Sequence, residues 1–374
     1  MRTYISRALL MTVMAAGILA LGACGADDDK GTNPTNGSGS GGGKPVKVGI
    51  MLIGPKADGG WNQIWLDSVD ALQKDAPEAE VTVLDNVNPG AQAQRAAERL
   101  ARDGNDIVVA TGGYADKDFA RAMRSNRDVA FYNAFGTASE NGLTPFDFGI
   151  EEGRYLDGIV AGSMTKSNVI GEVAGYPSPV SIRPLNALAL GARSVNPDVK
   201  VKVLFVNSFY DPAKERQAGQ ALADEDADVL AMDTNTPALP SVAKQRDLRL
   251  LGYGLKRPDA GKSWLGSFSI NWAPYLAEWV KAKQDGKTMS GIQYGGLKKG
   301  IIGSTEWASD IPQNVLDKVE DARRKIESGE LKIFQGPITD TKGKEVVPDG
   351  EVLDTPQELS TCCDWYVPGV EAKD

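Results

Sequence analysis

The chain has 374 residues, of which 41% are apolar and 24% charged, and its 50 acidic residues outnumber its 41 basic ones to give a formal net charge of −9. This length and composition fit two globular domains and exclude intrinsic disorder for most of the chain, while the acidic balance argues against binding to nucleic acid. The chain contains no histidine, which excludes catalytic triads built on imidazole and histidine-ligated metal sites.

The first 45 residues indicate an exported protein on a flexible tether. Arg2 and Arg7 precede an apolar run that is too short to cross a bilayer core of about 30 Å, so residues 1–23 fit a secretory signal peptide. The run ends in Leu-Gly-Ala-Cys24 and resembles a bacterial lipoprotein signal, which predicts acylation of Cys24 and anchoring at the extracytoplasmic face of a cell membrane. The alternative is an ordinary signal peptide with an incidental cysteine. Residues 24–45 are polar and Gly/Ser-rich and form the predicted tether.

From Val46 onward, short β-rich runs alternate with longer helical patterns, which predicts parallel βαβ construction. Trp61, Ile64, Trp65, Val69 and Leu72 have the 3.6-residue spacing of a helix with one buried face. The other helices expected in the first half are Gly90–Arg102 and Asp116–Ser125, and the expected strands are Val46–Ile53, Val81–Asp85, Ile107–Thr111 and Val129–Phe135.

A second set of strands and helices follows a boundary near Ile150. Its expected strands are Val169–Ala174, Val201–Asn207, Val229–Asp233, Leu248–Tyr253 and Leu265–Ile270, and its helices are Gly153–Thr165, Ile182–Ser194 and Pro212–Asp224. Two late helices, Ala273–Lys283 and Pro312–Ser328, suggest that the chain crosses back to the first lobe. We assign residues 46–150 and about 273–330 to lobe 1, and residues 151–272 and about 331–374 to lobe 2. The predicted fold class is α/β, with two Rossmann-like lobes of parallel strands joined by a hinge.

Cys362 and Cys363 are neighbours in the chain. A trans peptide holds adjacent Cα atoms about 3.8 Å apart, below the usual disulfide range of about 4.4 to 6.8 Å. We therefore expect two free thiols and keep a strained vicinal disulfide as the alternative. No histidine is available to complete a zinc site with them, and we predict neither a metal nor a cofactor.

Function in open α/β sheets concentrates in the loops at the carboxyl ends of the strands, and here aromatic and amide side chains dominate those loops. Such a lining suits a flat, neutral ligand stacked between rings and held by hydrogen bonds. For each aromatic residue the alternative is core packing, but Trp61 is favoured as a ligand contact because it follows a glycine-rich turn. The candidate binding residues are Asp58, Trp61, Asn62, Asn133, Phe209, Tyr210, Asn235, Tyr253, Trp272 and Lys298.

The motifs of nucleotide and catalytic sites are absent or weak. Residues 54–62 open a helix after a strand but lack both the P-loop ending and the GxGxxG spacing. The acidic stretch at 224–226 and the acidic pair at 151–152 could supply carboxylates for glycosidase-type acid/base chemistry, although a solvated helix end is the better interpretation. Lys298 could contact an oxygen of the ligand, and the alternative is that it lies on an exposed basic turn. We predict no enzymatic activity.

Several segments between Lys47 and Val370 resemble the basic membrane protein family, the lipoprotein substrate-binding components of ABC importers that include the purine nucleoside receptors of spirochaetes. The resemblance implies a fold like that of the type I periplasmic binding proteins. The matching segments are residues 58–61 (DGGW), 152–162 (EGRYLDGIVAG), 164–166 (MTK), 190–197 (LGARSVNP), 211–214 (DPAK), 294–298 (YGGLK) and 364–370 (DWYVPGV).

The resemblance also implies roles for single residues. It implies that a base stacks between Trp61 and Phe209 or Tyr210, and that Lys298 contacts the sugar of a nucleoside. Acidic residues of the nucleoside receptors correspond to Leu52, Asn133 and Gly254 here. The 59–61 loop and the Asn271-Trp272 pair instead resemble a branch associated with free purine bases such as adenine.

The resulting prediction is a lipid-anchored substrate-binding protein that captures a purine-type ligand, a free base or a nucleoside, between its two lobes. Its predicted partners are an ABC permease with its ATPase, with the protein itself a monomer. The alternatives are a ligand-sensing lipoprotein with the same cleft and, less favoured, a surface hydrolase.

Overall fold

The computed structural model describes residues 44–136 and 142–373. The predicted signal peptide, the predicted acylation site Cys24 and nearly all of the predicted tether lie outside the described residues. Within the described ranges, no helix combines the length and the apolar character needed to cross a membrane.

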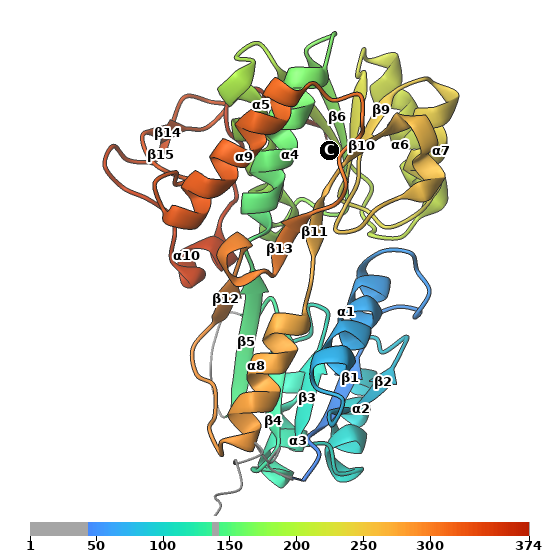
Figure 1. Cartoon of the computed structure of the whole chain (residues 1–374), viewed down its shortest axis with the longest axis vertical. Coiled ribbons are helices and arrows are strands. Elements are labelled where there is room, and N and C mark those ends of the chain that lie inside the picture. Colours follow the sequence, from blue (N-terminus) through green and yellow to red (C-terminus); the bar gives the residue numbers. More distant parts are fainter. Residues whose placement is uncertain (1–43, 137–141, 374) are drawn as a thin grey trace, which may run out of the picture. The chain divides into compact units, whose positions relative to one another are not determined.

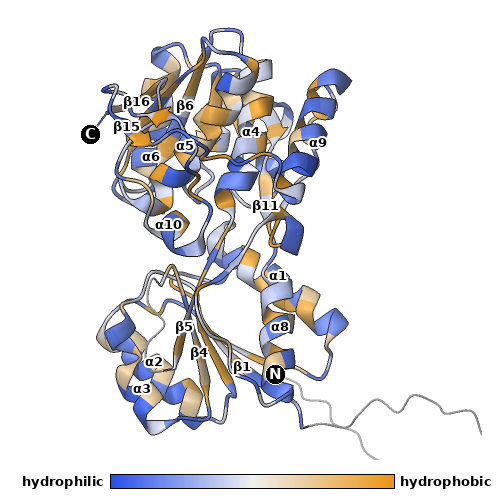
Figure 2. Cartoon of the chain, turned by 90° about the vertical axis from the view of Figure 1, so that its left-hand side faces the viewer, coloured by the Kyte–Doolittle hydropathy of each residue, from blue (hydrophilic) through white to orange (hydrophobic). Residues whose placement is uncertain are grey.

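Lobe 1 is built on a six-stranded sheet in which every neighbouring pair of strands is parallel, in the order β12-β5-β4-β3-β1-β2. Helices α1 (Trp61–Asp75) and α8 (Ala273–Gln284) cover one face of this sheet, while α2 (Ala91–Arg102) and α3 (Ala120–Ser125) cover the other (Figure 2). The strands are β1 (Lys47–Met51), β2 (Glu80–Leu84), β3 (Ile107–Ala110), β4 (Ala130–Ala134), β5 (Leu143–Phe148) and β12 (Gln293–Gly295).

Lobe 2 repeats this architecture with the parallel order β10-β9-β8-β6-β7-β16. Helices α4 (Ile150–Met164) and α5 (Pro179–Val195) cover one face, and α6 (Pro212–Asp224) and α7 (Ala238–Gln245) cover the other (Figure 1). The strands are β6 (Val169–Ala174), β7 (Lys200–Phe205), β8 (Val229–Met232), β9 (Arg249–Leu251), β10 (Trp264–Gly266) and β16 (Val370–Lys373). The predicted fold class is confirmed.

Helices α4 and α5 pack so closely that their backbones touch. A Cβ atom added to Gly191 would lie 2.0 Å from the carbonyl oxygen of Tyr155, and one added to Gly158 would lie 2.2 Å from that of Leu188. Only glycine fits at these two positions, which explains two glycines inside helices where they would otherwise cost stability.

The chain leaves lobe 2 after β11 (Phe268–Ile270), forms α8 and β12 in lobe 1, and returns through β13 (Ile302–Ser304), which pairs antiparallel with β11. Helix α9 (Gln313–Ser328) packs against α4 of lobe 2. This corrects the assignment of residues up to about 330 to lobe 1. The apolar stripe of α9, formed by Val315, Val319 and Ala322, is buried there.

The remaining elements are short, and most were not predicted from the sequence. They are the 3₁₀ helices Asp116–Asp118, Pro258–Ser263 and Leu297–Lys299, the strands β14 (Ile338–Thr339) and β15 (Glu345–Val347), and the helix α10 (Pro356–Thr361). Immediately after α10, Cys362 and Cys363 are joined by a disulfide bond, so the expectation of free thiols is wrong. The expectation of free thiols holds for a trans peptide between these cysteines, whereas their peptide is cis.

A continuous column of aromatic rings runs through the core of lobe 1. Trp272 stacks on Trp65 with ring centroids 4.6 Å apart, and Trp61 meets the edge of Trp272 at 5.5 Å. Further along, Tyr275 stacks on Trp279 at 5.3 Å, and Trp279 stacks on Tyr132 at 4.0 Å. The column connects α1, β4 and α8, and it ends at Trp61.

Candidate functional site

A cavity of about 480 Å³ is lined by loops at the carboxyl ends of strands from both sheets. Parallel strands bring these ends to one edge of each sheet, which is where ligands bind in open α/β folds. Of the predicted site residues, the structure brings Asp58, Trp61, Asn62, Phe209, Tyr210, Asn235 and Tyr253 to this cavity; the other lining residues are Ile53, Gly54, Pro55, Asn88, Thr111, Gly112, Gly113, Phe135, Tyr176, Val180, Ser208 and Asp233.

Asp58 organises the loop that leads into α1. Its Oδ1 accepts hydrogen bonds from the backbone N–H groups of Gly60 (2.9 Å) and Gln63 (3.0 Å), and its Oδ2 accepts from the backbone N–H (3.0 Å) and Nδ2 (2.8 Å) of Asn62. Asn62 Oδ1 in turn accepts from the backbone N–H of Gly54 at 3.4 Å. Both side chains line the cavity, but their hydrogen-bonding groups hold the loop at the helix N-terminus.

Trp61 is both a core residue and a wall of the cavity. Its side chain is only 9% exposed, its ring stacks on Phe135 at 5.7 Å, and its Nε1 donates to the Thr111 carbonyl oxygen at 2.9 Å. No packing reason for a bulky ring after this turn is evident in the sequence, but the contacts with Phe135 and Trp272 provide one.

Phe135 is a lining residue that the candidate list omitted. Its backbone has φ of +60°, a conformation that bulky side chains adopt rarely and at a cost of order 1–3 kcal/mol. This turn after β4 places the ring beside Trp61 at the cavity. Phe135 is the last residue of the predicted strand Val129–Phe135, but a strained φ leaves no signal in residue spacing.

Lobe 2 contributes three exposed aromatic residues, Tyr176 (42%), Phe209 (37%) and Tyr210 (53%). They are the only exposed large hydrophobic side chains among the described residues, and all three line the cavity. Tyr176 meets Phe209 edge to face at 5.3 Å. Exposed aromatic surface confined to one cavity indicates a ligand that covers it.

Two side chains of lobe 2 contact the 58–61 loop of lobe 1. Asn235 Oδ1 accepts from the backbone N–H of Trp61 at 3.2 Å, while its Nδ2 donates to the Phe209 carbonyl oxygen at 3.3 Å. Arg257 Nη1 donates to the Gly59 carbonyl oxygen at 3.2 Å. Asn235 therefore joins the loops that carry Trp61 and Phe209.

Three of the predicted site residues do not line the cavity. Trp272 is fully buried behind Trp61, Asn133 is buried and donates to the carbonyl oxygen of Tyr114 at 2.9 Å, and Lys298 is exposed on the 297–299 turn. Gly254 is also absent from the lining, with φ of +71°, and a Cβ there would lie 2.6 Å from Ile64 Cδ1.

Asp233 follows β8 and was missing from the candidate list, although its loop was recognised. It is 3% exposed, and its Oδ2 accepts from Ser181 Oγ at 2.5 Å and from the Gly175 backbone N–H at 3.2 Å. Burial, with the nearby Glu172 carboxylate as the second cause, raises the pKa of Asp233 to about 7.

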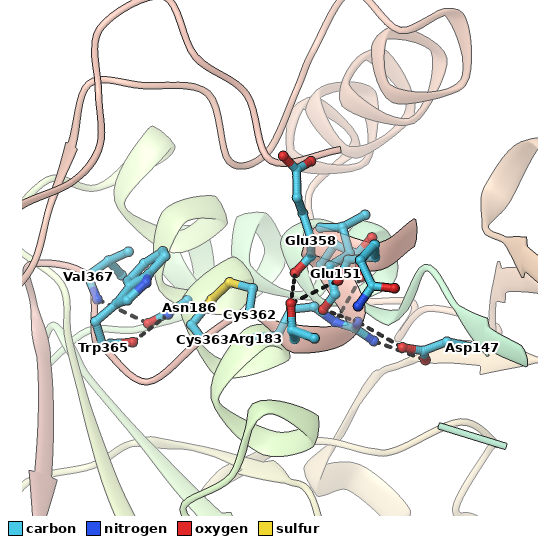
Figure 3. The surroundings of a disulfide bond; sticks show 12 residues. Asp147, Glu151, Arg183, Asn186, Glu358, Cys362, Cys363, Trp365 and Val367 are labelled. Atoms are coloured by element: carbon cyan, nitrogen blue, oxygen red, sulfur yellow. Dashed lines mark hydrogen bonds and ion pairs between the residues drawn. A yellow bond between two sulfur atoms is a disulfide. The ribbon is translucent and has the colours of Figure 1, made fainter. Parts of the chain in front are cut away.

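A buried ion cluster connects the lobes next to the disulfide (Figure 3). Arg183 of α5 forms a two-pronged contact with Asp147 of β5, at 3.0 and 3.2 Å, and donates to the Leu359 carbonyl oxygen at 2.5 Å. Its Nε lies 3.4 Å from Glu151 Oε2, and Tyr294 donates to Glu151 Oε1 at 2.7 Å. The cluster lies where β5 of lobe 1 passes into α4 of lobe 2.

The two parallel lobes, with a cavity at their strand ends, have the fold of the type I periplasmic binding proteins. Residues 45–337 match the model of the Bmp family, described as ABC transporter substrate-binding protein PnrA-like, and the chain belongs to this family. The family resemblance inferred from the sequence is confirmed.

Relatives span most of the chain. A purine-binding protein of Brucella abortus is 34% identical over 88% of this chain and 93% of its own length. A Haloferax volcanii protein named for glucose binding in an ABC transporter is 29% identical over 91% of this chain and 84% of its own length. A solved solute-binding protein of an ABC transporter from Conexibacter woesei, 23% identical, superimposes with a TM-score of 0.67 over 77% of this chain and 98% of that chain, which shows the shared fold.

Proposed function

We propose that this protein captures a purine-type heterocycle, a free base such as adenine or its nucleoside, and presents it to an ABC permease and its ATPase. The main support for this proposal is a cavity lined by aromatic side chains from both lobes. Lobe 1 contributes Trp61 and Phe135, and lobe 2 contributes Tyr176, Phe209 and Tyr210. Planar rings stack on such side chains with a gain of about 1–3 kcal/mol per ring. The purine-binding relative supports this ligand class.

Closure of the two lobes on the ligand follows from the placement of these rings. A ligand that contacts both lobes at once stabilises the arrangement in which the lobes approach, which is a shift of population toward the closed form. Asn235 supports this mechanism because it already links the Trp61 and Phe209 loops. Acylation of Cys24 would keep the loaded protein beside the permease at the extracytoplasmic face of the membrane.

Isothermal titration calorimetry of the soluble chain with adenine, adenosine, guanosine and glucose tests the proposed ligand class. We expect binding of adenine and no comparable binding of glucose. A preference for glucose would replace the purine proposal with a sugar-binding one, as the name of the Haloferax volcanii relative suggests for that protein. Mass spectrometry of the ligand that co-purifies with the protein provides an independent identification.

A further inference from the structure

Two carboxylates line the described cavity, Asp58 and Asp233. Both oxygens of Asp58 accept hydrogen bonds from its own loop, four in total. Asp233 differs because both of its hydrogen bonds fall on Oδ2. Among the described residues, no donor contacts Asp233 Oδ1. The cavity wall therefore presents one free carboxylate oxygen.

The charged groups around Asp233 do not supply the missing partner. Arg154 of α4 favours ionisation of Asp233 electrostatically, but its guanidinium pairs with Glu172 of β6 at 2.8 Å and lies 3.7 Å from Asp157. Glu172 opposes ionisation of Asp233. Tyr253 is partly buried and also lines the cavity, and the two hydrogen bonds that Asp233 accepts come from Gly175 and Ser181 instead. A carboxylate oxygen on a cavity wall without a protein donor is free to accept a hydrogen bond from a bound ligand.

We propose that Asp233 Oδ1 accepts a hydrogen bond from an N–H group at the edge of the stacked heterocycle and thereby selects ligands that carry such a donor. This inference rests on the proposed function and adds the specificity-determining group to it. The aromatic side chains provide area with little discrimination among rings, whereas a fixed acceptor of this kind discriminates against analogues that lack the donor.

The test is run at about pH 8, where the Asp233 carboxyl group is ionised. It compares adenine with two analogues, 9-methyladenine and N6,N6-dimethyladenine, each of which lacks one kind of N–H donor. Asp233→Asn replaces the free acceptor by an amide of the same shape, and we expect adenine affinity to fall about 10- to 100-fold. The analogue that lacks the N–H donor bound by Asp233 should bind wild type more weakly than adenine does, by a similar factor. Asp233→Asn should weaken the binding of that analogue little further, because the hydrogen bond is already missing. Asp198→Asn, an exposed change with the same loss of charge, is the matched control and should bind like wild type.

The outcomes separate this inference from the proposed function. If wild type binds adenine and Asp233→Asn binds it equally well, the inference is overturned while the proposed function stands. The inference is also overturned if, for both analogues, the loss of affinity caused by the missing N–H group and the loss caused by Asp233→Asn add independently. If wild type binds none of the three compounds, the purine proposal fails and the inference fails with it. Melting of the ligand-free variants shows whether each is folded.

Discussion

Phe209 is the aromatic residue at which ligand binding can be separated from folding. Its ring is 37% exposed and contacts only Tyr176 among the described aromatic rings. We expect Phe209→Ala to weaken adenine binding about 5- to 150-fold and to leave the melting temperature of the ligand-free protein almost unchanged. Calorimetry and thermal melts measure the two effects. Unchanged affinity would remove Phe209 from the binding site.

At Trp61, ligand binding and folding cannot be separated by mutation. If the ring contacted only the ligand, Trp61→Ala would leave the melting temperature of the ligand-free protein unchanged. The ring, however, is buried against Phe135 and Trp272. Truncation of a buried ring of this size costs about 3–5 kcal/mol of folding stability. We therefore expect Trp61→Ala to lower both stability and affinity.

Lys298→Ala tests a role that the family resemblance implies and the cavity lining does not include. Because Lys298 is exposed and does not line the cavity, we expect adenosine and adenine to bind this variant as they bind wild type. Calorimetric titration with both ligands decides the matter. A loss restricted to adenosine would show that the 297–299 turn reaches the sugar in the bound state.

The sequence located the cavity loops but not the direction in which their side chains point. Their position after strands made Trp61, Phe209, Asn235 and Tyr253 candidate binding residues, and the structure places all four in the lining of the cavity. Asn133 lies within β4 and Trp272 immediately precedes α8, and both side chains are buried away from the cavity. Such choices depend on tertiary packing, which residue spacing does not encode.

At the scale of elements, the loop before α1 depends on one carboxylate. Asp58→Ala would leave three backbone N–H groups and the Asn62 side chain without their acceptor. Loss of a comparable helix cap costs about 0.5–2 kcal/mol, so we expect lower stability in urea unfolding together with weaker adenine binding. Asp67→Ala, further along α1, is the comparison and should preserve binding. Normal affinity in Asp58→Ala would show that the loop orders without it.

Regular strands and helices with clear periodicity were predictable, and interrupted ones were not. Pro212–Asp224 and Val169–Ala174 match their predicted bounds. Strand β5 was missed because Pro145 and Asp147 interrupt its apolar run, although Asp147 is there to pair with Arg183. The predicted strand Leu265–Ile270 divides into β10 and β11 at Ser267, where the chain turns from one sheet to the next.

At the scale of the whole molecule, Arg183 and Asp147 form an ion pair between elements of different lobes, and both side chains are 3% exposed. Arg183→Met would leave Asp147 buried without its partner, and breaking such a pair costs about 3–5 kcal/mol. Urea unfolding of Arg183→Met, compared with Arg246→Met in the exposed Arg246–Asp224 pair, measures the difference. We expect less than about 1 kcal/mol for the exposed pair. Equal losses in the two variants would contradict the structural role of the cluster.

Stability should also depend on pH in a defined direction. The folded-state pKa values of Glu152, Asp157 and Asp233 are raised to about 7, each with burial as the largest cause. Between about pH 4.5 and pH 7 the unfolded chain has released these protons while the folded chain keeps them, so stability falls as pH rises through this window and levels off above it.

Thermal melts of the ligand-free protein at intervals from about pH 5 to pH 8 test this dependence. Histidine, the usual cause of changes in this range, is absent from the chain. We expect the melting temperature to decrease with pH and the slope to become shallower in Asp233→Asn. A melting temperature that rises with pH would contradict the raised pKa values of these three carboxyl groups.

The aromatic column of lobe 1 gives the protein a built-in optical probe. Trp61 at the cavity is in ring contact with Trp272, which stacks on Trp65, while Tyr275, Trp279 and Tyr132 continue the contact series. Excitation energy migrates readily between indole rings at such separations. A base stacked on Trp61 would therefore quench emission from the coupled indoles as well as from the ring it touches. Intrinsic fluorescence should report occupancy of the cavity without any attached dye.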